Sequence, residues 1–387
     1  MKDWPAYKLG EITRVIDCKH YTPAYIDNGI PVVRPRDVKA GSLDLSGCLR
    51  VSEQEYENLI ENYVPKQRDI VLARNASFGI PSLVKTAERF ALGQDTVIID
   101  PRNQEPEYIY YCIASPVVQR QIASASMGST FKRINLGLIR KLYIPLPPLP
   151  EQKKIAQILS TWDKAIELLE KKISAKEKLK KGLMQQLLTG TLRLRSATGE
   201  PFGPPAKKGE LPEGWREVKL GEVGDIISVK KLQLKSTEYQ DSGRYPIIDQ
   251  GQEFIAGYTD RKNIFDGYPV IIFGDHTRIT KWVNQKFVPG ADGTQIIKAK
   301  PLFDSFLLYL KIKSLRILNL GYSRHFKFVK EATFKIPENP KEQKDISSLF
   351  QKLENSIGSL MQKKKLLDLQ KKGLMQQLLT GKVRVKR

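Results

Sequence analysis

Polar side chains gather at the ends of predicted strands and in turns, and their types suit hydrogen bonding to DNA. Arginine can donate a forked pair of hydrogen bonds to guanine, asparagine and glutamine can pair with adenine, and aspartate can accept from cytosine. Lysines in the same loops would bind phosphates and fix the register on the duplex. In the first half of the chain we predict such contacts from Arg34, Arg36, Lys39, Arg74, Asn75, Gln94, Lys132 and Arg133. In the second half we predict them from Asp275, His276, Thr277, Arg278, Tyr322, Ser323, Arg324, His325 and Lys327.

Each assignment has a plainer alternative. An arginine in these loops could equally bind a phosphate or lie solvated at the surface, and either histidine could form hydrogen bonds within its own loop. Asp275 and His276 could also be imagined as an acid/base pair. No serine or cysteine nucleophile motif lies near them, so we do not expect catalysis there.

Motifs for chemistry are missing from the sequence. There is no GxxxxGK[ST] loop for ATP, no G-x-G-x-x-G opening a helix, and no Asn/Asp-Pro-Pro-aromatic tetrapeptide of the kind an amino-methyltransferase needs. The 3 cysteines form no CxxC spacing and the 3 histidines form no HxxxH pair. We therefore expect a non-catalytic chain that binds no metal or cofactor, in a reducing, cytoplasmic setting.

The charge balance points to a polyanionic partner. The formal net charge of +22 would repel itself in a compact protein, and double-stranded DNA is the leading candidate to neutralise it. A membrane is less suitable, because the chain has no long apolar run, no amphipathic surface anchor and no signal peptide at residues 1–10. Solvated lysine-rich helices are the alternative explanation of the charge.

The chain contains an internal duplication. KKGLMQQLLTG occurs at residues 180–190 and again at 371–381, a shift of 191 residues. The beginning of each copy is also repeated, as WPAYKLGE at 4–11 and WREVKLGE at 215–222, a shift of 211 residues. The block between these two repeated segments is therefore about 20 residues shorter in the second copy, and the two blocks look unrelated in sequence.

Each copy ends in a predicted long helix. Apolar residues recur at steps of three and four, which is the spacing of a coiled-coil seam rather than of a globular helix. The seam residues are Ile155, Leu159, Trp162, Ile166, Leu169, Ile173, Ile346, Phe350, Leu353, Ile357 and Leu360. Lysines interrupt the later half of each seam, so coupling should be weaker there; they are Lys176, Lys180, Lys364 and Lys371. Packing of each helix on its own domain alone is the alternative.

These patterns predict an α+β chain built as a pseudo-twofold repeat, in which two recognition domains of mixed or antiparallel strands with helices are separated by two antiparallel helices. The predicted segments are a first domain at 1–146, a coiled-coil helix at 147–190, a linker at 191–214, a second domain at 215–338, a second coiled-coil helix at 339–381 and a basic tail at 382–387.

The sequence resembles the specificity subunits of type I restriction-modification enzymes over nearly its whole length. The matching motifs are LPPLPEQKKIAQIL (146–159), the repeated KKGLMQQLLTG, LPEGW (211–215), PVIIFGDHT (269–277), ADG (291–293) and YSRHFK (322–327). The first block lacks the last two patterns and has only GSTFKRIN at 128–135.

The resemblance implies two target recognition domains, each reading one half of a split DNA target. It implies two modification (methyltransferase) subunits that carry S-adenosylmethionine and methylate adenine, and restriction subunits that use ATP, with Mg²⁺, to translocate and cut DNA. The conserved helices would be their docking surface. Helices of about 40 residues are roughly 60 Å long, so the readers could lie at most about 17 base pairs apart at ~3.4 Å per base pair. The alternatives are a self-sufficient nuclease or methyltransferase, and an architectural coiled-coil protein that binds DNA without sequence preference.

Overall fold

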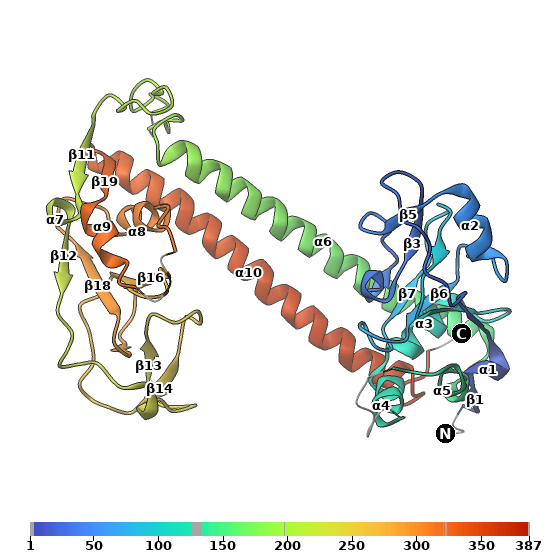
Figure 1. Cartoon of the computed structure of the whole chain (residues 1–387). Helices are drawn as coiled ribbons and strands as arrows, with labels where there is room; N and C mark the ends of the chain where they lie inside the picture. The colour runs from blue at the N-terminus through green and yellow to red at the C-terminus, as the bar shows by residue number, and fades with distance from the viewer. Residues whose placement is uncertain (1–3, 126–132, 197, 320, 322, 386–387) are drawn as a thin grey trace. The chain divides into compact units, whose positions relative to one another are not determined.

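The computed structural model describes residues 4–125, 133–196, 198–319, 321 and 323–385 (Figure 1). The chain forms two compact units. Unit 1 contains residues 1–171 and 362–387, and unit 2 contains residues 172–361. Each unit therefore joins one variable block to one end of each long helix.

In unit 1, the described strands form a sheet of order β2-β9-β6-β7-β4, a smaller sheet of order β5-β3-β8 and the antiparallel pair β1-β10. The strands are β1 (Ala6–Lys8), β2 (Arg14–Asp17), β3 (Ile30–Val33), β4 (Gly41–Ser42), β5 (Leu49–Val51), β6 (Ile70–Ala73), β7 (Pro81–Leu83), β8 (Ala91–Leu92), β9 (Thr96–Asp100) and β10 (Tyr143–Pro145). The helices of the block are α1 (Leu9–Ile12), the 3₁₀ turn η1 (Pro35–Asp37), α2 (Glu53–Ile60), α3 (Pro106–Ala114), α4 (Pro116–Ala125) and α5 (Leu136–Lys141).

Unit 2 repeats this topology in its described residues. The order β12-β18-β15-β16 corresponds to β2-β9-β6-β7, β14-β13-β17 corresponds to β5-β3-β8, and β11-β19 corresponds to β1-β10. The strands are β11 (Trp215–Lys219), β12 (Gly224–Ile227), β13 (Tyr245–Ile248), β14 (Gly257–Thr259), β15 (Val270–Gly274), β16 (Thr280–Val283), β17 (Val288–Pro289), β18 (Thr294–Ala299) and β19 (Thr333–Pro337). The helices are α7 (Leu220–Val223), η2 (Ser236–Glu238), α8 (Ser305–Lys313) and α9 (Phe326–Glu331). Blocks without evident sequence similarity thus share one scaffold, and the α+β prediction is confirmed.

The long helices are α6 (Leu149–Leu187) and α10 (Pro340–Leu378). The repeated glycines Gly190 and Gly381 follow them with φ of 74° each, a left-handed conformation that favours glycine. A Cβ at Gly190 would also lie 2.2 Å from Cγ of Pro212. Glycine is therefore required where the chain turns away from α6.

Ion pairs show that α6 and α10 run antiparallel within each unit. In unit 1, Lys371 pairs with Asp163, and the Lys364 ammonium lies 3.0 Å from the Glu170 carboxylate. In unit 2, Lys180 pairs with Glu354, and Leu187 at the end of α6 belongs to the same core as Ile346 near the start of α10. The antiparallel coiled coil predicted from the sequence is confirmed. Three lysines that interrupt the apolar seam thus have carboxylate partners on the opposite helix.

The proposed seam residues are buried to different degrees. Burial is nearly complete at the two helix starts, and the most enclosed members are Ile155, Leu159, Ile346, Phe350 and Ile357. Half-buried positions occur further along, and these are Trp162, Ile166, Leu169, Ile173, Leu353 and Leu360. Ile155 and Leu159 belong to the core of unit 1, whereas Ile346 and Phe350 belong to the core of unit 2. Helix and block are therefore parts of one hydrophobic core in each unit.

Each unit also has a clasp made of an arginine, a glutamate and a tryptophan. In unit 2, Arg193 donates to both carboxylate oxygens of Glu342, at 2.7 and 2.9 Å, and lies over the Trp215 ring. In unit 1, Arg384 donates to both oxygens of Glu151 at 2.8 Å and lies over the Trp4 ring. An arginine that follows one long helix thus holds the start of the other. Arg384 lies in the segment predicted as a basic tail, yet it is folded against unit 1.

Candidate nucleic-acid interface

In unit 1, three loops at the ends of neighbouring strands line one cleft. The loops follow β3, follow β6 and precede β9, and the segment at residues 21–25 completes the wall. The cleft has a volume of about 350 Å³ and is lined by Tyr21, Tyr25, Arg34, Arg36, Asn75, Gln94 and Asp95. Four of the predicted DNA-binding residues of the first block therefore lie together.

Several cations predicted to bind DNA are held by carboxylates. Arg34 donates from Nε and Nη2 to the two oxygens of Asp37, at 2.8 and 3.1 Å. This hydrogen bonding raises the pKa of Arg34 above its ordinary value. Arg74 is 5% exposed and donates to Asp17 Oδ1 at 2.9 Å and to the Ile134 carbonyl at 3.0 Å. Arg34 and Arg74 therefore fix the loops from within.

Asp95 joins two further predicted residues. It accepts from Asn75 Nδ2 at 2.6 Å and from Arg133 Nε at 2.7 Å. Asn75 therefore donates within the loops, and the residue lines the cleft. Arg36, Lys39 and Gln94 are exposed and have no side-chain hydrogen bond or ion pair within the described part of the chain, and Lys132 lies outside the described residues.

In unit 2, the equivalent loops follow β13, follow β15 and precede β18. Gln250 connects all three. Its Oε1 accepts from the His276 amide at 3.1 Å, its Nε2 donates to the Asp292 carbonyl at 2.7 Å, and its own carbonyl accepts from the Thr277 hydroxyl at 2.6 Å. Gly293 follows with φ of 87°, and a Cβ there would lie 2.6 Å from Gln250 Nε2. This glycine lets the loops approach one another closely.

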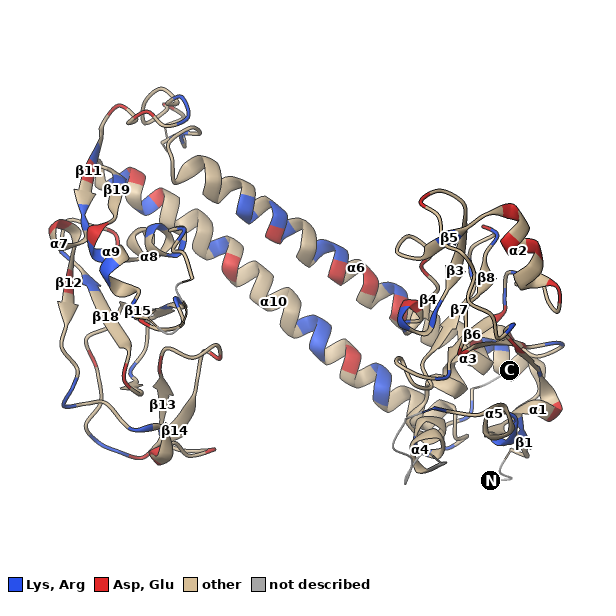
Figure 2. Ribbon diagram, viewed as in Figure 1, with Lys and Arg blue, Asp and Glu red and all other residues tan. Residues whose placement is uncertain are grey.

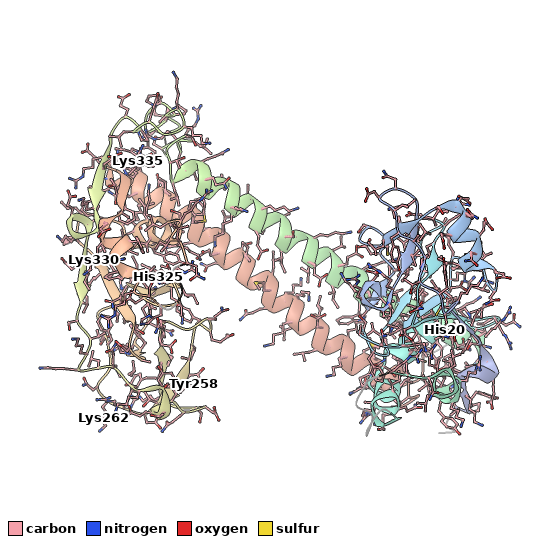
Figure 3. The ribbon with its side chains drawn as sticks, in the orientation of Figure 1. His20, Tyr258, Lys262, His325, Lys330 and Lys335 are labelled. Atoms are coloured by element: carbon pink, nitrogen blue, oxygen red, sulfur yellow. The ribbon has the colours of Figure 1, made fainter. Side chains whose placement is uncertain are left out.

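The two motifs singled out in the second block are joined to each other. Asp275 is 4% exposed, and its Oδ1 accepts from the Phe326 amide at 2.8 Å. The His325 ring is fully buried, and its Nδ1 lies 3.0 Å from the Asp275 carbonyl. His325 is labelled among the side chains of unit 2 in Figure 3. The DNA-binding roles predicted for Asp275 and His325 remain predictions, and both side chains hold the loop after β15 against the start of α9.

Arg74 and Asp275 occupy equivalent positions. The Arg74 amide donates to the Asp95 carbonyl, and the Asp275 amide donates to the Gly293 carbonyl, both at 2.8 Å. Asp95 and Gly293 each lie just before an equivalent strand, β9 and β18 respectively. The carbonyls of Arg74 and Asp275 accept from Ile134 and His325, just before the equivalent helices α5 and α9. The side-chain bond has opposite polarity, because Arg74 donates to a carbonyl whereas Asp275 accepts from an amide. The hydrogen bonds that hold this loop to the start of the helix, here called a tie, are therefore made by unlike residues in the two units.

The other predicted residues of the second block differ in accessibility. Arg278 is half-buried, with φ of 62°, and donates to the Ile317 carbonyl at 3.1 Å. Ser323 lies 3.5 Å from the His325 ring. Arg324 and Lys327 are exposed, and Tyr322 lies outside the described residues.

Sequence reasoning missed several residues of these loops. Tyr21 and Tyr25, each 37% exposed, line the cleft of unit 1, and Gln250 and Asp292 belong to the equivalent loops of unit 2. The two tyrosines lie in HYTPAY, a segment without strand or helix periodicity, so only the richness in aromatic residues could have drawn attention to them. Gln250 lies two residues after the strand 245–248, where polar strand ends are expected.

One buried cation lies at the junction of α8 with the end of α6. Burial lowers the pKa of Lys311 from its usual value to about 7, while Glu342 opposes that shift. The amine donates to the carbonyls of Leu188 and Lys335 and lies over the Trp215 ring. Lys311 therefore acts in packing rather than in DNA contact.

Many of the chain's cations lie on the long helices, where lysines are interspersed with acidic residues (Figure 2). Exposed lysines of α6 and α10 are Lys153, Lys154, Lys164, Lys171, Lys172, Lys178, Lys181, Lys341, Lys344, Lys352, Lys363, Lys365 and Lys372. In the described part of the chain, no group of three or more His, Cys, Asp or Glu side chains could hold a metal ion. No helix among the described residues is both long enough and apolar enough to cross a membrane.

Comparison with known families assigns the chain. The family described as type I restriction modification DNA specificity domain matches residues 1–178 and 212–369. The chain belongs to this family. The resemblance inferred from the motifs is thereby confirmed, and the two matched segments coincide with the two copies of the internal repeat.

Curated relatives named as type I specificity subunits match most or all of the chain. The putative type I restriction enzyme MjaX specificity subunit of Methanocaldococcus jannaschii is 27% identical, over 100% of this chain and 95% of its own length. The MjaVIII specificity subunit of the same organism is also 27% identical, over 76% of this chain and 75% of its own length.

Solved structures support the fold. The S subunit of a type I restriction-modification system from M. genitalium has a TM-score of 0.68 at 16% identity, covering 97% of this chain and 96% of that chain. A chain from a study of complex assembly and conformational transition of the type I R-M system has a TM-score of 0.54 at 16% identity, covering 99% of both chains. The type I specificity subunit fold is therefore shown for this chain.

Proposed function

We propose that this chain recognises a bipartite DNA target, with the strand-end loops of each unit reading one half-site. The observation that supports this proposal is that both units have the same loop scaffold but different side chains on it. Arg34 and Arg36 follow β3, whereas Asp249, Gln250 and Gly251 follow the equivalent strand β13. Two units that recognise different half-site sequences, here called words, would need this combination of a shared backbone scaffold and different side chains.

Exposure divides the predicted residues into readers and supports. Exposed side chains are free to meet base edges or phosphates, and these are Arg36, Lys39, Gln94, Arg324 and Lys327. Arg34, Arg74, Asn75, Arg133, Asp275, Arg278 and His325 already have protein partners that fix the loops. In this proposal the first group contacts DNA, and the second group gives those contacts their geometry. His276 and Thr277 lie between these groups, because Gln250 holds the backbone of one and the hydroxyl of the other.

The long helices are proposed to set the spacing of the two half-sites and to dock the modification subunits, with the restriction subunits joining that complex. In unit 2, a groove of about 1390 Å³ runs along the end of α6 and the facing part of α10. Its apolar wall contains Met184, Leu188, Ile357 and Met361, and its rim contains Lys180, Lys181, Lys313 and Arg316. An amphipathic helix with acidic residues on its polar face would suit this groove.

Unit 1 offers a different surface at the equivalent place. Met375 and Leu379, the counterparts of Met184 and Leu188 in the repeat, are covered by α4, and the remaining cavity is about 10 Å³. The chemistry is assigned to partners: S-adenosylmethionine to the modification subunits, ATP and Mg²⁺ to the restriction subunits. This chain is proposed to be non-catalytic and to bind no cofactor itself.

Methylation mapping tests the proposal. Single-molecule sequencing of the host genome, with and without this gene, should show adenine methylation in two short words separated by a spacer of fixed length. Replacing residues 11–146 by the block of another family member should change one word and leave the other intact. A single continuous site would contradict the proposal. Equal binding to all duplexes with a steep salt dependence would instead establish an architectural protein. Methylation or cleavage by the purified chain alone would establish an enzyme.

A further inference from the structure

The cleft of unit 1 and the loops around it contain several cations, but they differ in what they can still bind. Arg34 is engaged by Asp37 through two hydrogen bonds, Arg74 is buried against Asp17, and Arg133 is held by Asp95. Each of these guanidiniums has a carboxylate partner within 3 Å. A base edge would have to displace that carboxylate, so these arginines are poor candidates for base contact.

Arg36 is different from its neighbours. Its side chain lines the cleft and is exposed, and within the described residues no hydrogen bond or ion pair engages its guanidinium. All five of its N–H donors therefore remain available.

The backbone beneath Arg36 is fixed. The residue is the centre of the 3₁₀ turn η1, in which the Asp37 carboxylate accepts from the Arg34 amide at 3.0 Å and the Val38 amide donates to the Pro35 carbonyl at 3.3 Å. Proline at the first position restricts this turn further. A long side chain on a rigid turn loses less entropy on binding than one on a mobile loop.

We infer that Arg36 reads a guanine in the half-site bound by unit 1, through a forked pair of hydrogen bonds to N7 and O6 in the major groove. This inference rests on the proposed function. The chemistry follows from polarity, because guanine presents two adjacent acceptors on its major-groove edge and arginine presents donors only. Gln94 lines the same cleft and suits the neighbouring base pair.

Unit 2 lacks this donor. The amides of Gly93 and Gly290 bond to the carbonyls of Val33 and Ile248, which makes the last residues of β3 and β13 equivalent. The position three residues on is Arg36 in unit 1 and Gly251 in unit 2. The guanine read by Arg36 therefore belongs to one word of the target only.

The test is in-vitro selection by the purified full-length chain from a duplex library with randomised positions. The wild type should enrich two words with a spacer, and one word should contain an invariant guanine. Arg36→Ala should reduce discrimination for that guanine by roughly 5- to 150-fold. The second word should be enriched as before, which also shows that the variant is folded.

Two further variants distinguish base reading from charge. Arg36→Lys keeps the charge but loses the fork, so it should lose the guanine preference while retaining overall affinity and its salt dependence. Arg102→Ala removes another exposed arginine of unit 1 that lies outside the cleft, and should leave both words unchanged. Unchanged words with Arg36→Ala, or a uniform loss of affinity that Arg36→Lys restores, would overturn the inference. Absence of two words in the wild type would instead overturn the proposed function.

Discussion

Replacing Glu342 by glutamine removes the charge at the centre of the clasp in unit 2. The carboxylate accepts two hydrogen bonds from Arg193 and one from Trp215 Nε1 at 3.3 Å, and the side chains of Arg193 and Glu342 are each 2% exposed. Loss of one partner of a buried pair leaves the other charge without compensation, which typically costs about 3–5 kcal/mol. We expect a loss of this size in the free energy of unfolding of unit 2.

The equivalent pair in unit 1 is a matched control within the same chain. Glu151 is as well enclosed, with 7% of its side chain exposed, but Arg384 is 40% exposed. Water can therefore solvate the arginine after Glu151→Gln, and the loss should be only about 1 kcal/mol. Geometry is nearly identical in the two clasps, so solvent access is the variable that differs between them.

Hydrogen exchange with mass spectrometry is the suitable assay, because two units need not unfold in one transition. Glu342→Gln should accelerate exchange in β11 and β19 by about two to three and a half orders of magnitude, since each 1.4 kcal/mol is tenfold. Adding Arg193→Met should recover part of the loss, because no unpaired charge then remains. Equal losses from Glu342→Gln and Glu151→Gln, or no loss from either, would refute the reasoning.

Three other changes have expected outcomes. Burial places the pKa of Lys311 at about 7, so between that pH and about 10.5 the folded state binds fewer protons than the unfolded state. The unfolding free energy should rise with pH across this window, by at most about 1.4 kcal/mol per unit, and Lys311→Met should abolish the rise. Asp275→Ala removes the acceptor of the Phe326 amide and should destabilise unit 2 by about 1–3 kcal/mol, without changing the word read by unit 1. Ile357→Asp should disrupt assembly or half-site spacing more than Ile166→Asp, because Ile357 is buried and Ile166 is half-buried.

Each of these outcomes has a measurement and a contradicting result. Denaturant unfolding at several pH values checks Lys311→Met, and an unchanged pH slope would contradict the assignment. Selected target words and exchange rates check Asp275→Ala, and a change in the first word would show that Asp275 acts beyond its own unit. Methylation maps check the helix variants, and normal methylation with both aspartates present would argue against the seam.

The long helices and the layout of the domains could be predicted because their signals are periodic and repeated. Apolar steps of three and four marked α6 and α10, and glycines marked their ends. Burial of Asp275 and His325 could not be predicted, because their contact joins residues 50 positions apart. A polar residue at a strand end has the same appearance in sequence whether it faces DNA or another loop.

The common topology of the two blocks was also hidden from sequence reasoning. Gln152 and Gln343 accept from the amides of Glu105 and Asp304, which aligns α3 with α8 and places Cys112 where Lys311 lies. A buried cysteine in one unit thus replaces a buried lysine in the other. When such unlike residues fill equivalent positions, sequence comparison fails although packing persists.

The opposite polarity of the ties at Arg74 and Asp275 constrains how hybrid chains can arise. A fragment that carried only the loop after β6 into unit 2 would replace Asp275 by an arginine, which has donors only, and would leave the buried Phe326 amide without its acceptor. Recombination within a block would therefore leave a buried mismatch. Crossovers outside the blocks, in the repeated sequence of the helices, would move both members of each tie together. Exchange of whole blocks is the route by which a lineage of such proteins could acquire new targets without losing its fold.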